Sequence, residues 1–150
     1  MEEKQGKNSQ PGSLMEKIVI DTNILFSALH SPGKKTFKVL TGSPSCQFFC
    51  PNFLIAEIWE HKQELVDKAK VDEPLVTQYL LGVLPYVHFF NESLISVKNF
   101  FEAFHLVKDV DEDDIAFVAL ALELEARLWT RDTELKEGLL RKGFDRFFEP

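Results

Sequence analysis

The sequence predicts a three-layer α/β protein in which a central parallel β-sheet is flanked by helices. Two observations support this fold class. Short apolar segments alternate along the chain with longer segments of helical periodicity, and several of the short segments are apolar at consecutive positions. Strands that are apolar on both faces are typical of a parallel sheet that is buried between helices.

The first predicted strand is the β-branched run Lys17-Ile18-Val19-Ile20-Asp21, which ends in a polar residue. The helix after it ends at the breaker Ser31-Pro32-Gly33, and Pro51 suits the first turn of a long helix. From the N-terminus, the first predicted elements are a strand at 17–21, helices at 22–29 and 35–40, a strand at 47–50, and helices at 51–70 and 73–81.

In the second half, Pro85 ends a helix, and apolar residues then recur at helical spacing between Ser93 and Phe104. A strongly apolar helix begins near Asp113, and the apolar run before Arg131 is a further strand. The predicted elements are a strand at 86–90, helices at 93–104 and 113–125, a strand at 127–130, a helix at 133–140 and a last strand at 144–148.

The length of 150 residues and the 45% apolar content predict one domain with one core. Residues 1–14 are rich in Gly, Ser, Gln and Lys and predict a flexible leader, so we assign the domain to residues 15–150. This polar start lacks the apolar core of a signal peptide. The longest uncharged stretch, 74–91, contains prolines and polar residues that a membrane span would not carry, so we expect a cytoplasmic protein.

The charge of the chain restricts how it could handle nucleic acid. Seventeen basic and 24 acidic side chains give a net charge of −7, so a phosphate-bearing substrate must be held by local groups or by cations. The two cysteines, Cys46 and Cys50, share one short segment, which gives no sign of a disulfide scaffold; we expect buried thiols. No Gly-rich phosphate loop or Gly-x-Ser-x-Gly motif occurs in the sequence.

Two aspartates follow predicted strands directly. Asp21 ends the first strand, and Asp132 follows the strand Leu128-Trp129-Thr130. Both suit the N-cap of the next helix. Ligand sites in open parallel sheets lie beyond the carboxyl ends of the strands, so the same two side chains are also candidate functional groups.

Glu57 lies on an otherwise apolar face of its predicted helix. It is four positions after Phe53 and three after Leu54, so it shares a face with both. A charged group on such a face is unfavourable unless it is paired or binds a metal ion. An arginine from elsewhere in the fold is the alternative explanation.

The run from Asp109 to Asp114 opens the apolar helix that begins at Ile115. Acidic residues at a helix N-terminus complement its dipole, and this accounts for most of the run as solvent-facing caps. Asp114 differs because it heads the apolar stripe of that helix and points inward. Several inward carboxylates without a counter-charge predict a raised pKa for at least one of them, which a Mg²⁺ or Mn²⁺ ion would relieve. Such an ion would promote hydrolysis of a phosphodiester bond.

These residues together resemble the PIN-domain family. The resemblance rests on Val19-Ile20-Asp21-Thr22-Asn23, an acid on the helix after the second strand, the segment Asp114 to Ala121, and Leu128 to Asp132, in this order over roughly 17–148. It implies a PIN-like sandwich and a metal-dependent ribonuclease like the VapC-type toxins, which antitoxins neutralise. The metal-binding acids that it implies are Asp21, Glu57, Asp114 and Asp132.

The resemblance also implies supporting residues and partners. Asn23 and Thr130 match polar positions near the family's site, and Asp111 or Asp113 could supplement Asp114. The implied partners are RNA, an antitoxin protein and a second copy in a homodimer or dimer of dimers. The apolar segment 75–90 is the expected interface, with core beneath its neighbours as the alternative. Candidate basic residues that guide RNA are Lys34, Lys35, Lys38, Arg131 and Arg141.

Two other functions remain open from the sequence. A phosphotransfer enzyme could use Asp21 as a nucleophile, but Asn23 stands where a second aspartate is usual and no catalytic lysine follows a later strand. A non-catalytic PIN-like module could instead bind nucleic acid or a protein. Titration with Mn²⁺ separates a metal enzyme from such a module.

Overall fold

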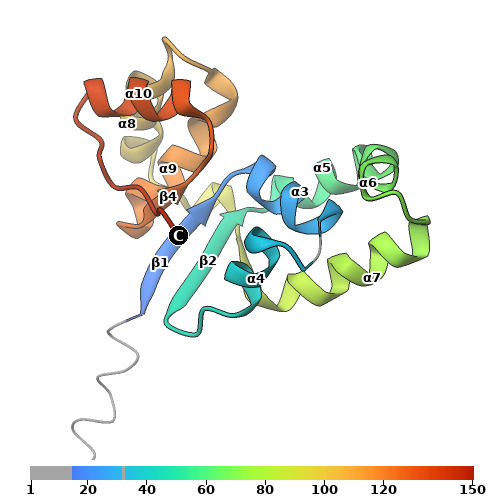
Figure 1. Cartoon of the computed structure of the whole chain (residues 1–150). Helices are drawn as coiled ribbons and strands as arrows, with labels where there is room; N and C mark the ends of the chain where they lie inside the picture. Colours follow the sequence, from blue (N-terminus) through green and yellow to red (C-terminus); the bar gives the residue numbers. More distant parts are fainter. Residues whose placement is uncertain (1–14, 32) are drawn as a thin grey trace, which may run out of the picture.

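The structure is a computed structural model that describes residues 15–31 and 33–150 (Figure 1). In this part of the chain, four strands form one sheet in which every neighbouring pair is parallel, which confirms the predicted fold class. The predicted leader, residues 1–14, lies outside the described residues. In the order β3-β2-β1-β4 across the sheet, the strands are β3 (Val87–Phe90), β2 (Cys46–Pro51), β1 (Glu16–Ile20) and β4 (Arg127–Trp129).

Strand β1 occupies the middle of the sheet and is buried on both faces at its carboxyl end. Ile18 pairs with Phe48 of β2 on one side and with Arg127 of β4 on the other. Burial on both faces explains why the sequence has a continuous β-branched run here instead of an alternating pattern. We call the edge of the sheet where β1 and β4 end, after Ile20 and Trp129, the carboxyl edge.

Eight α-helices of the described residues flank the sheet in two groups. Figure 1 shows α8, α9 and α10 on one side of the molecule, with β4, and the helices from α3 to α7 on the other. Helix α9 packs on β1, β2 and β4, and α3 packs on α4, α6 and α7. The helices are α3 (Thr22–His30), α4 (Lys35–Thr41), α5 (Phe53–Glu60), α6 (Lys62–Ala69), α7 (Glu73–Val83), α8 (Val97–Val107), α9 (Ile115–Leu124) and α10 (Thr133–Arg141).

The predicted long helix at 51–70 is wrong, because the chain bends at His61 and forms α5 and α6 instead. The His61 backbone leaves the helical region at φ −104° and ψ 18°. Its ring packs edge-on against Phe26 of α3 and lies 2.9 Å from a carboxylate oxygen of Glu64. No Gly or Pro marks this bend; contacts with α3 hold it.

Two other helices begin later than predicted, at Val97 and Ile115, because short 3₁₀ helices precede them. The side chains of Asn91 and Asp111 each accept a hydrogen bond from the backbone N–H two positions on, at 3.0 and 2.9 Å. Such local bonds compete with the first turn of an α-helix. The 3₁₀ helices are η1 (Leu84–Tyr86), η2 (Glu92–Leu94) and η3 (Glu112–Asp114).

The predicted last strand at 144–148 is reduced to a single bridge between Phe147 and Leu128. Leu128 donates to the carbonyl of Arg146 and accepts from the N–H of Phe148, both at 2.9 Å. Since β4 is only three residues long, it offers too little edge for a longer ladder. Aromatic packing holds this end of the chain, with the Phe148 ring 5.3 Å from that of Trp129.

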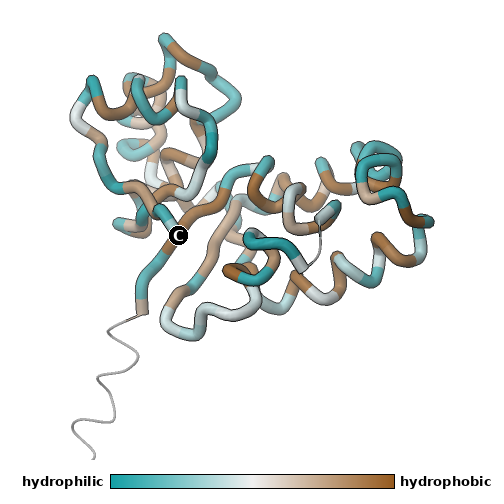
Figure 2. The backbone as a smooth tube through the Cα atoms, in the orientation of Figure 1, coloured by the Kyte–Doolittle hydropathy of each residue, from teal (hydrophilic) through white to brown (hydrophobic). Residues whose placement is uncertain are grey.

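The apolar core lies between the sheet and its helices. Figure 2 shows apolar colouring along the carboxyl half of β1, whereas hydrophilic and apolar residues alternate along the outer helices. Leu25 of α3, Phe48 of β2 and Leu120 of α9 are almost completely buried. None of the helices in the described part of the chain has the length and apolar character needed to cross a membrane.

Candidate active site

Asp21 is held at the carboxyl edge by the start of α3. Its backbone is extended, and its Oδ1 atom accepts a hydrogen bond from the N–H of Ile24 at 3.0 Å, so the predicted N-cap is confirmed. Only 6% of the residue is exposed. Burial raises the pKa of this carboxyl, although hydrogen bonds from Thr130 and Ile24 lower it. The cap therefore holds an acid that is unfavourable to ionise at this edge.

Asp132 lies beyond the carboxyl end of β4, three residues after Trp129. Its Oδ1 atom accepts from the N–H of Leu135 at 3.1 Å and caps α10, as predicted. Its own N–H donates to the hydroxyl of Thr130, which is buried, at 3.1 Å. Thr130 thus connects the two acids, because its hydroxyl also stabilises the charged form of Asp21.

Asp114 reaches the same edge from the start of α9. It is half-buried, and its side chain makes no capping hydrogen bond to this helix. Burial, and then repulsion from Asp111, Asp21, Asp132 and Asp113, raises the pKa of Asp114 to about 7. Asp114 thus has the raised pKa that the sequence predicted, and both strand-end aspartates contribute to it. Neither Asp21 nor Asp132 lines the cavity that contains Asp114.

Glu57 and Asp114 lie in the wall of one cavity, which we call the acid cavity. It measures about 570 Å³. Phe53 lies on the cavity side of α5, as the spacing to Glu57 predicted, and its ring packs edge-on against Phe117 at 5.5 Å. Leu54 is fully buried away from it. The lining residues are Thr22, Phe53, Glu57, Phe100, Glu112, Asp113, Asp114, Ile115, Ala116 and Phe117.

The lining of the acid cavity includes Thr22 and Glu112, which the sequence did not single out for the site. It also includes Asp113, which the pattern of the run suggested as a solvent-facing cap and the family resemblance as a possible supplement to Asp114. Both acids are exposed, yet they also border the cavity. Asp111 accepts a hydrogen bond from the N–H of Asp113 at 2.9 Å, at the start of the 3₁₀ helix that carries Glu112 and Asp113.

The donor set at the carboxyl edge fits a hard divalent cation. Its acids supply only carboxylate oxygens, and Glu57 has no ion pair with Lys, Arg or His among residues 15–31 and 33–150. Within the same residues, no three His, Cys, Asp or Glu side chains are arranged to hold one metal ion. Mg²⁺ needs only one or two direct carboxylates because it retains water ligands, so a wider spacing of acids suits it.

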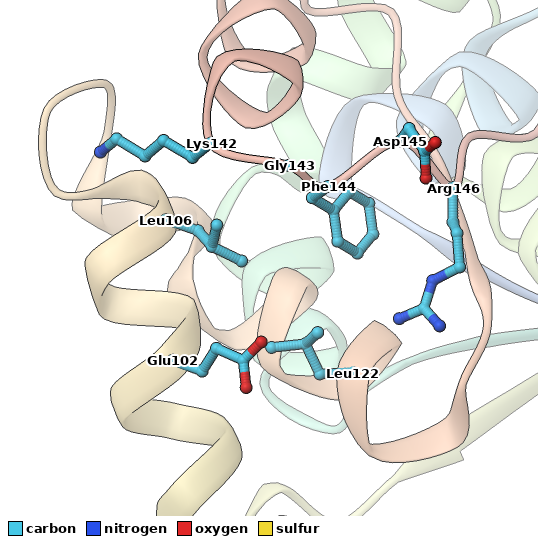
Figure 3. Close-up of a pocket in the computed structure, with 8 residues that line it drawn as sticks. All are labelled: Glu102, Leu106, Leu122, Lys142, Gly143, Phe144, Asp145 and Arg146. Carbon is cyan, nitrogen blue, oxygen red and sulfur yellow. The ribbon is translucent and has the colours of Figure 1, made fainter.

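A different cavity, shown in Figure 3, lies toward the C-terminal end of α9 and contains none of the predicted acids. Glu102 and Leu106 of α8, Leu122 of α9 and the segment 142–146 line it. The Arg146 guanidinium there lies 5.4 Å from the ring centroid of Phe144. This region provides control positions away from the carboxyl edge.

The chain is thus an α/β protein with a parallel sheet and with acidic residues near the carboxyl ends of its strands. The profile of the PIN domain matches residues 19–147. This chain therefore belongs to the PIN-domain family, as its motifs indicated. Comparison with curated proteins found no match.

A solved structure has a similar fold. It is a chain of the VapBC2 complex from Rickettsia felis, which was crystallised with a DNA fragment from its promoter. The two chains superpose with a TM-score of 0.58 and 14% sequence identity, over 81% of this chain and 92% of that one. At this sequence identity, the comparison shows only that the two chains share a fold.

Proposed function

We propose that this chain is a metal-dependent endoribonuclease that hydrolyses phosphodiester bonds of RNA. One observation carries the proposal: the Asp114 carboxyl is half-buried among other carboxylates, with its pKa raised to about 7. Charge repulsion of this kind weakens a fold unless a cation relieves it. Membership of the PIN-domain family supports the same chemistry.

In this proposal Asp21, Glu57, Asp114 and Asp132 hold Mg²⁺ or Mn²⁺, directly or through water. The bound ion would polarise the phosphoryl oxygen and lower the pKa of a bound water. The chain's own residues orient the site: Ile24 and Leu135 donate their N–H groups to Asp21 and Asp132 and fix both carboxylates. Thr130 contacts both strand-end acids through its hydroxyl, which accepts from the N–H of Asp132 and donates to the Asp21 carboxylate.

The proposal is tested by cleavage of a defined single-stranded RNA with Mn²⁺, with Mg²⁺ and with EDTA. We expect cleavage only with a divalent ion, and its loss in Asp21→Asn. An asparagine still caps α3, so this variant keeps the fold while it removes a charge. Asp67→Asn on the exposed side of α6 is the control and should cleave normally. Unchanged cleavage by a folded Asp21→Asn variant would falsify the mechanism.

The alternative is a non-catalytic PIN-like module that binds nucleic acid or a protein. The absence of any group of three His, Cys, Asp or Glu side chains that could hold one metal ion, among the residues that the structure describes, favours this alternative. Calorimetric titration with Mn²⁺ separates the two proposals. A nuclease should bind Mn²⁺ through the acids and lose this heat in Asp21→Asn, whereas a binding module should show no such heat.

We also propose that the chain is the toxin of a toxin–antitoxin pair. The similar fold in the VapBC2 complex supports this proposal. Induced expression in a bacterial host should then stop growth, and Asp21→Asn should restore it. Equal growth with both proteins would contradict toxicity while leaving the nuclease assay unaffected.

A second copy of the chain is proposed to bind the apolar surface formed by four side chains of α8 and by Ile115 of α9. The α8 residues are Val97, Phe100, Phe101 and Phe104. Val97 and Phe101 are 68% and 64% exposed. This face shares Phe100 and Ile115 with the acid cavity, so a dimer here would align two acid cavities in one groove.

This position differs from the segment 75–90 that the sequence indicated. Val76, Val83 and Val87 of that segment are buried in the core, and Leu81 is its most exposed apolar side chain. Light scattering should give twice the 17.3 kDa chain mass for the wild type and for Leu81→Glu, and a single chain for Phe101→Glu. If Leu81→Glu is instead the single chain and Phe101→Glu the dimer, the interface lies on α7.

A further inference from the structure

Arg131 lies at the carboxyl edge between two residues with fixed positions. The hydroxyl of Thr130, which is 1% exposed, accepts a hydrogen bond from the N–H of Asp132 at 3.1 Å. Asp132 in turn caps α10 through the N–H of Leu135. The backbone of Arg131 is therefore held beside the two strand-end acids.

The Arg131 side chain reaches from this edge to α3 and α4. One guanidinium nitrogen donates to the hydroxyl of Ser27 at 3.1 Å, and the other terminal nitrogen donates to the hydroxyl of Thr36. Thr36 is 3% exposed, and the two hydroxyl oxygens lie 3.4 Å apart. Because two hydroxyls fix its fork, the guanidinium has a defined direction before any ligand binds.

The positive charge of Arg131 is not neutralised by these contacts. Both acceptors are neutral hydroxyls, and Arg131 forms no ion pair with Asp or Glu within the described part of the chain. Arg127, by contrast, lies 2.7 Å from a carboxylate oxygen of Glu16. A guanidinium has five N–H donors, so three remain on an exposed side chain beside the acids.

We propose that Arg131 binds a backbone phosphate of the RNA next to the bond that is cleaved, an inference that rests on the proposed function. A chain with a net charge of −7 and an acidic site repels RNA, so a fixed cation beside the acids is needed to seat it. The planar guanidinium matches two phosphate oxygens, as the point charge of a lysine does not.

A merely structural role is the competing explanation for Arg131. The side chain ties the loop after β4 to α3 and α4 through Ser27 and Thr36. If this tie were its whole role, replacement would lower thermal stability and leave the recognition of RNA unchanged. The readouts that separate the two roles are the KM for RNA and its dependence on salt.

The test compares Arg131→Gln, Arg131→Lys and the control Arg146→Gln, which lies at the cavity of Figure 3. Cleavage of one single-stranded RNA is measured at constant Mn²⁺ over a series of NaCl concentrations. For Arg131→Gln we expect KM to rise about tenfold with kcat within about threefold, as for one lost charge-assisted bond. The slope of log(kcat/KM) against log[NaCl] should decrease by about 0.7, the value for one phosphate.

Arg131→Lys should have the salt slope of the wild type and a KM between those of the wild type and Arg131→Gln. Arg146→Gln should match the wild type in both. A substrate with one neutral methylphosphonate next to the cleaved bond should raise the KM of the wild type. It should leave the KM of Arg131→Gln unchanged. This non-additivity would assign the contact to that phosphate.

An Arg131→Gln variant with a lower Tm but the wild-type KM and salt slope would overturn the proposal. A loss of Mn²⁺ affinity in Arg131→Gln, measured by calorimetry, would also overturn it, because Arg131 would then act through the carboxylates. If the wild type itself neither binds Mn²⁺ nor cleaves RNA, the proposed function fails. Intact wild-type cleavage with unchanged Arg131→Gln kinetics rejects only the phosphate contact.

Discussion

Two aspartates in the acidic run 109–114, only five positions apart, occupy opposite electrostatic environments. Asp109 is exposed, and its carboxylate lies 2.8 Å from the Nζ atom of Lys142; this hydrogen bond and charge lower its pKa. Asp114 is half-buried, and burial together with neighbouring carboxylates raises its pKa to about 7. One acid is neutralised by the chain itself, and the other is left among like charges.

The difference is not caused by a shortage of cations. Elsewhere on the described surface, Arg127 pairs with Glu16, and Lys136 pairs with Glu149. The fold therefore gives Asp109 and some other acids a cationic partner, and among the described residues it gives none to Asp114. We interpret the uncompensated charge as a site for a cation from solution, and the contrast between Asp109 and Asp114 provides matched variants for testing this.

The largest expected effect is on cleavage. Asp114→Asn should reduce metal-dependent cleavage of RNA about 100-fold or more, because charge stabilisation by a metal ion is worth several kcal/mol. Asp109→Asn makes the same chemical change in the same run and should cleave at close to the wild-type rate. Initial rates at saturating Mn²⁺ measure both, and equal losses in the two variants would contradict the contrast.

The second effect concerns the packing that separates the two aspartates. Val110, between them, packs against Gly138 of α10, where an added Cβ would lie 2.5 Å from the Val110 Cγ2 atom. Gly138→Ala should therefore destabilise the protein by about 1–3 kcal/mol despite the better helix propensity of alanine. Urea unfolding measures this.

The control for this packing is Gly82→Ala in α7. A Cβ at Gly82 meets no atom within 4 Å, so the same substitution should stabilise by up to about 1 kcal/mol. If both variants gain stability, Val110 moves freely and does not fix the position of the acidic run.

The third effect is a pH dependence of stability in the metal-free protein. Asp114 ionises near pH 3.8 when unfolded and near 7 when folded, so the folded state binds more protons in between. The free energy of unfolding should therefore fall as pH rises from about 4 to 7. After allowance for solvent screening of a half-exposed group, we expect about 1–2 kcal/mol.

Chemical unfolding in EDTA at several pH values tests this third effect. Asp114→Asn should make the fall of stability with pH shallower, because only the raised pKa of Asp21 then remains, and it should be more stable than the wild type at neutral pH. Mn²⁺ should stabilise the wild type at pH 7.5 and have little effect on Asp114→Asn. A wild-type profile that rises with pH would show that other groups dominate.

The features that the sequence predicted well are those that depend on local patterns. The β-branched run before Asp21 specifies a buried strand, and Asp21 and Asp132 cap the helices that follow, because capping needs only residues three positions apart. The order of these motifs was also enough to indicate the PIN-domain family.

The features that it missed depend on contacts between distant segments. The bend at His61 is held by Phe26 of a different helix, and the exposed apolar side chains of α8 follow from which of its faces packs on α9. The place of Glu112 at the acid cavity depends on the packing of distant segments around it, because Thr22, Phe53 and Phe100 line the same cavity. Spacing alone cannot show which acids of a run meet a cation, as Asp109 and Lys142 illustrate.

The smallest expected effect is the mirror image of the third. Because Lys142 lowers the pKa of Asp109 in the folded state, this pair adds stability above the unfolded pKa of 3.8, and the gain is lost as pH falls through the folded pKa. Asp109→Asn should thus be slightly less stable than the wild type at pH 7 and equal to it near pH 2. The difference stays small because the pair is exposed to solvent. Opposite signs for Asp109→Asn and Asp114→Asn in metal-free unfolding at pH 7 would establish the contrast, and a shared sign would reject it.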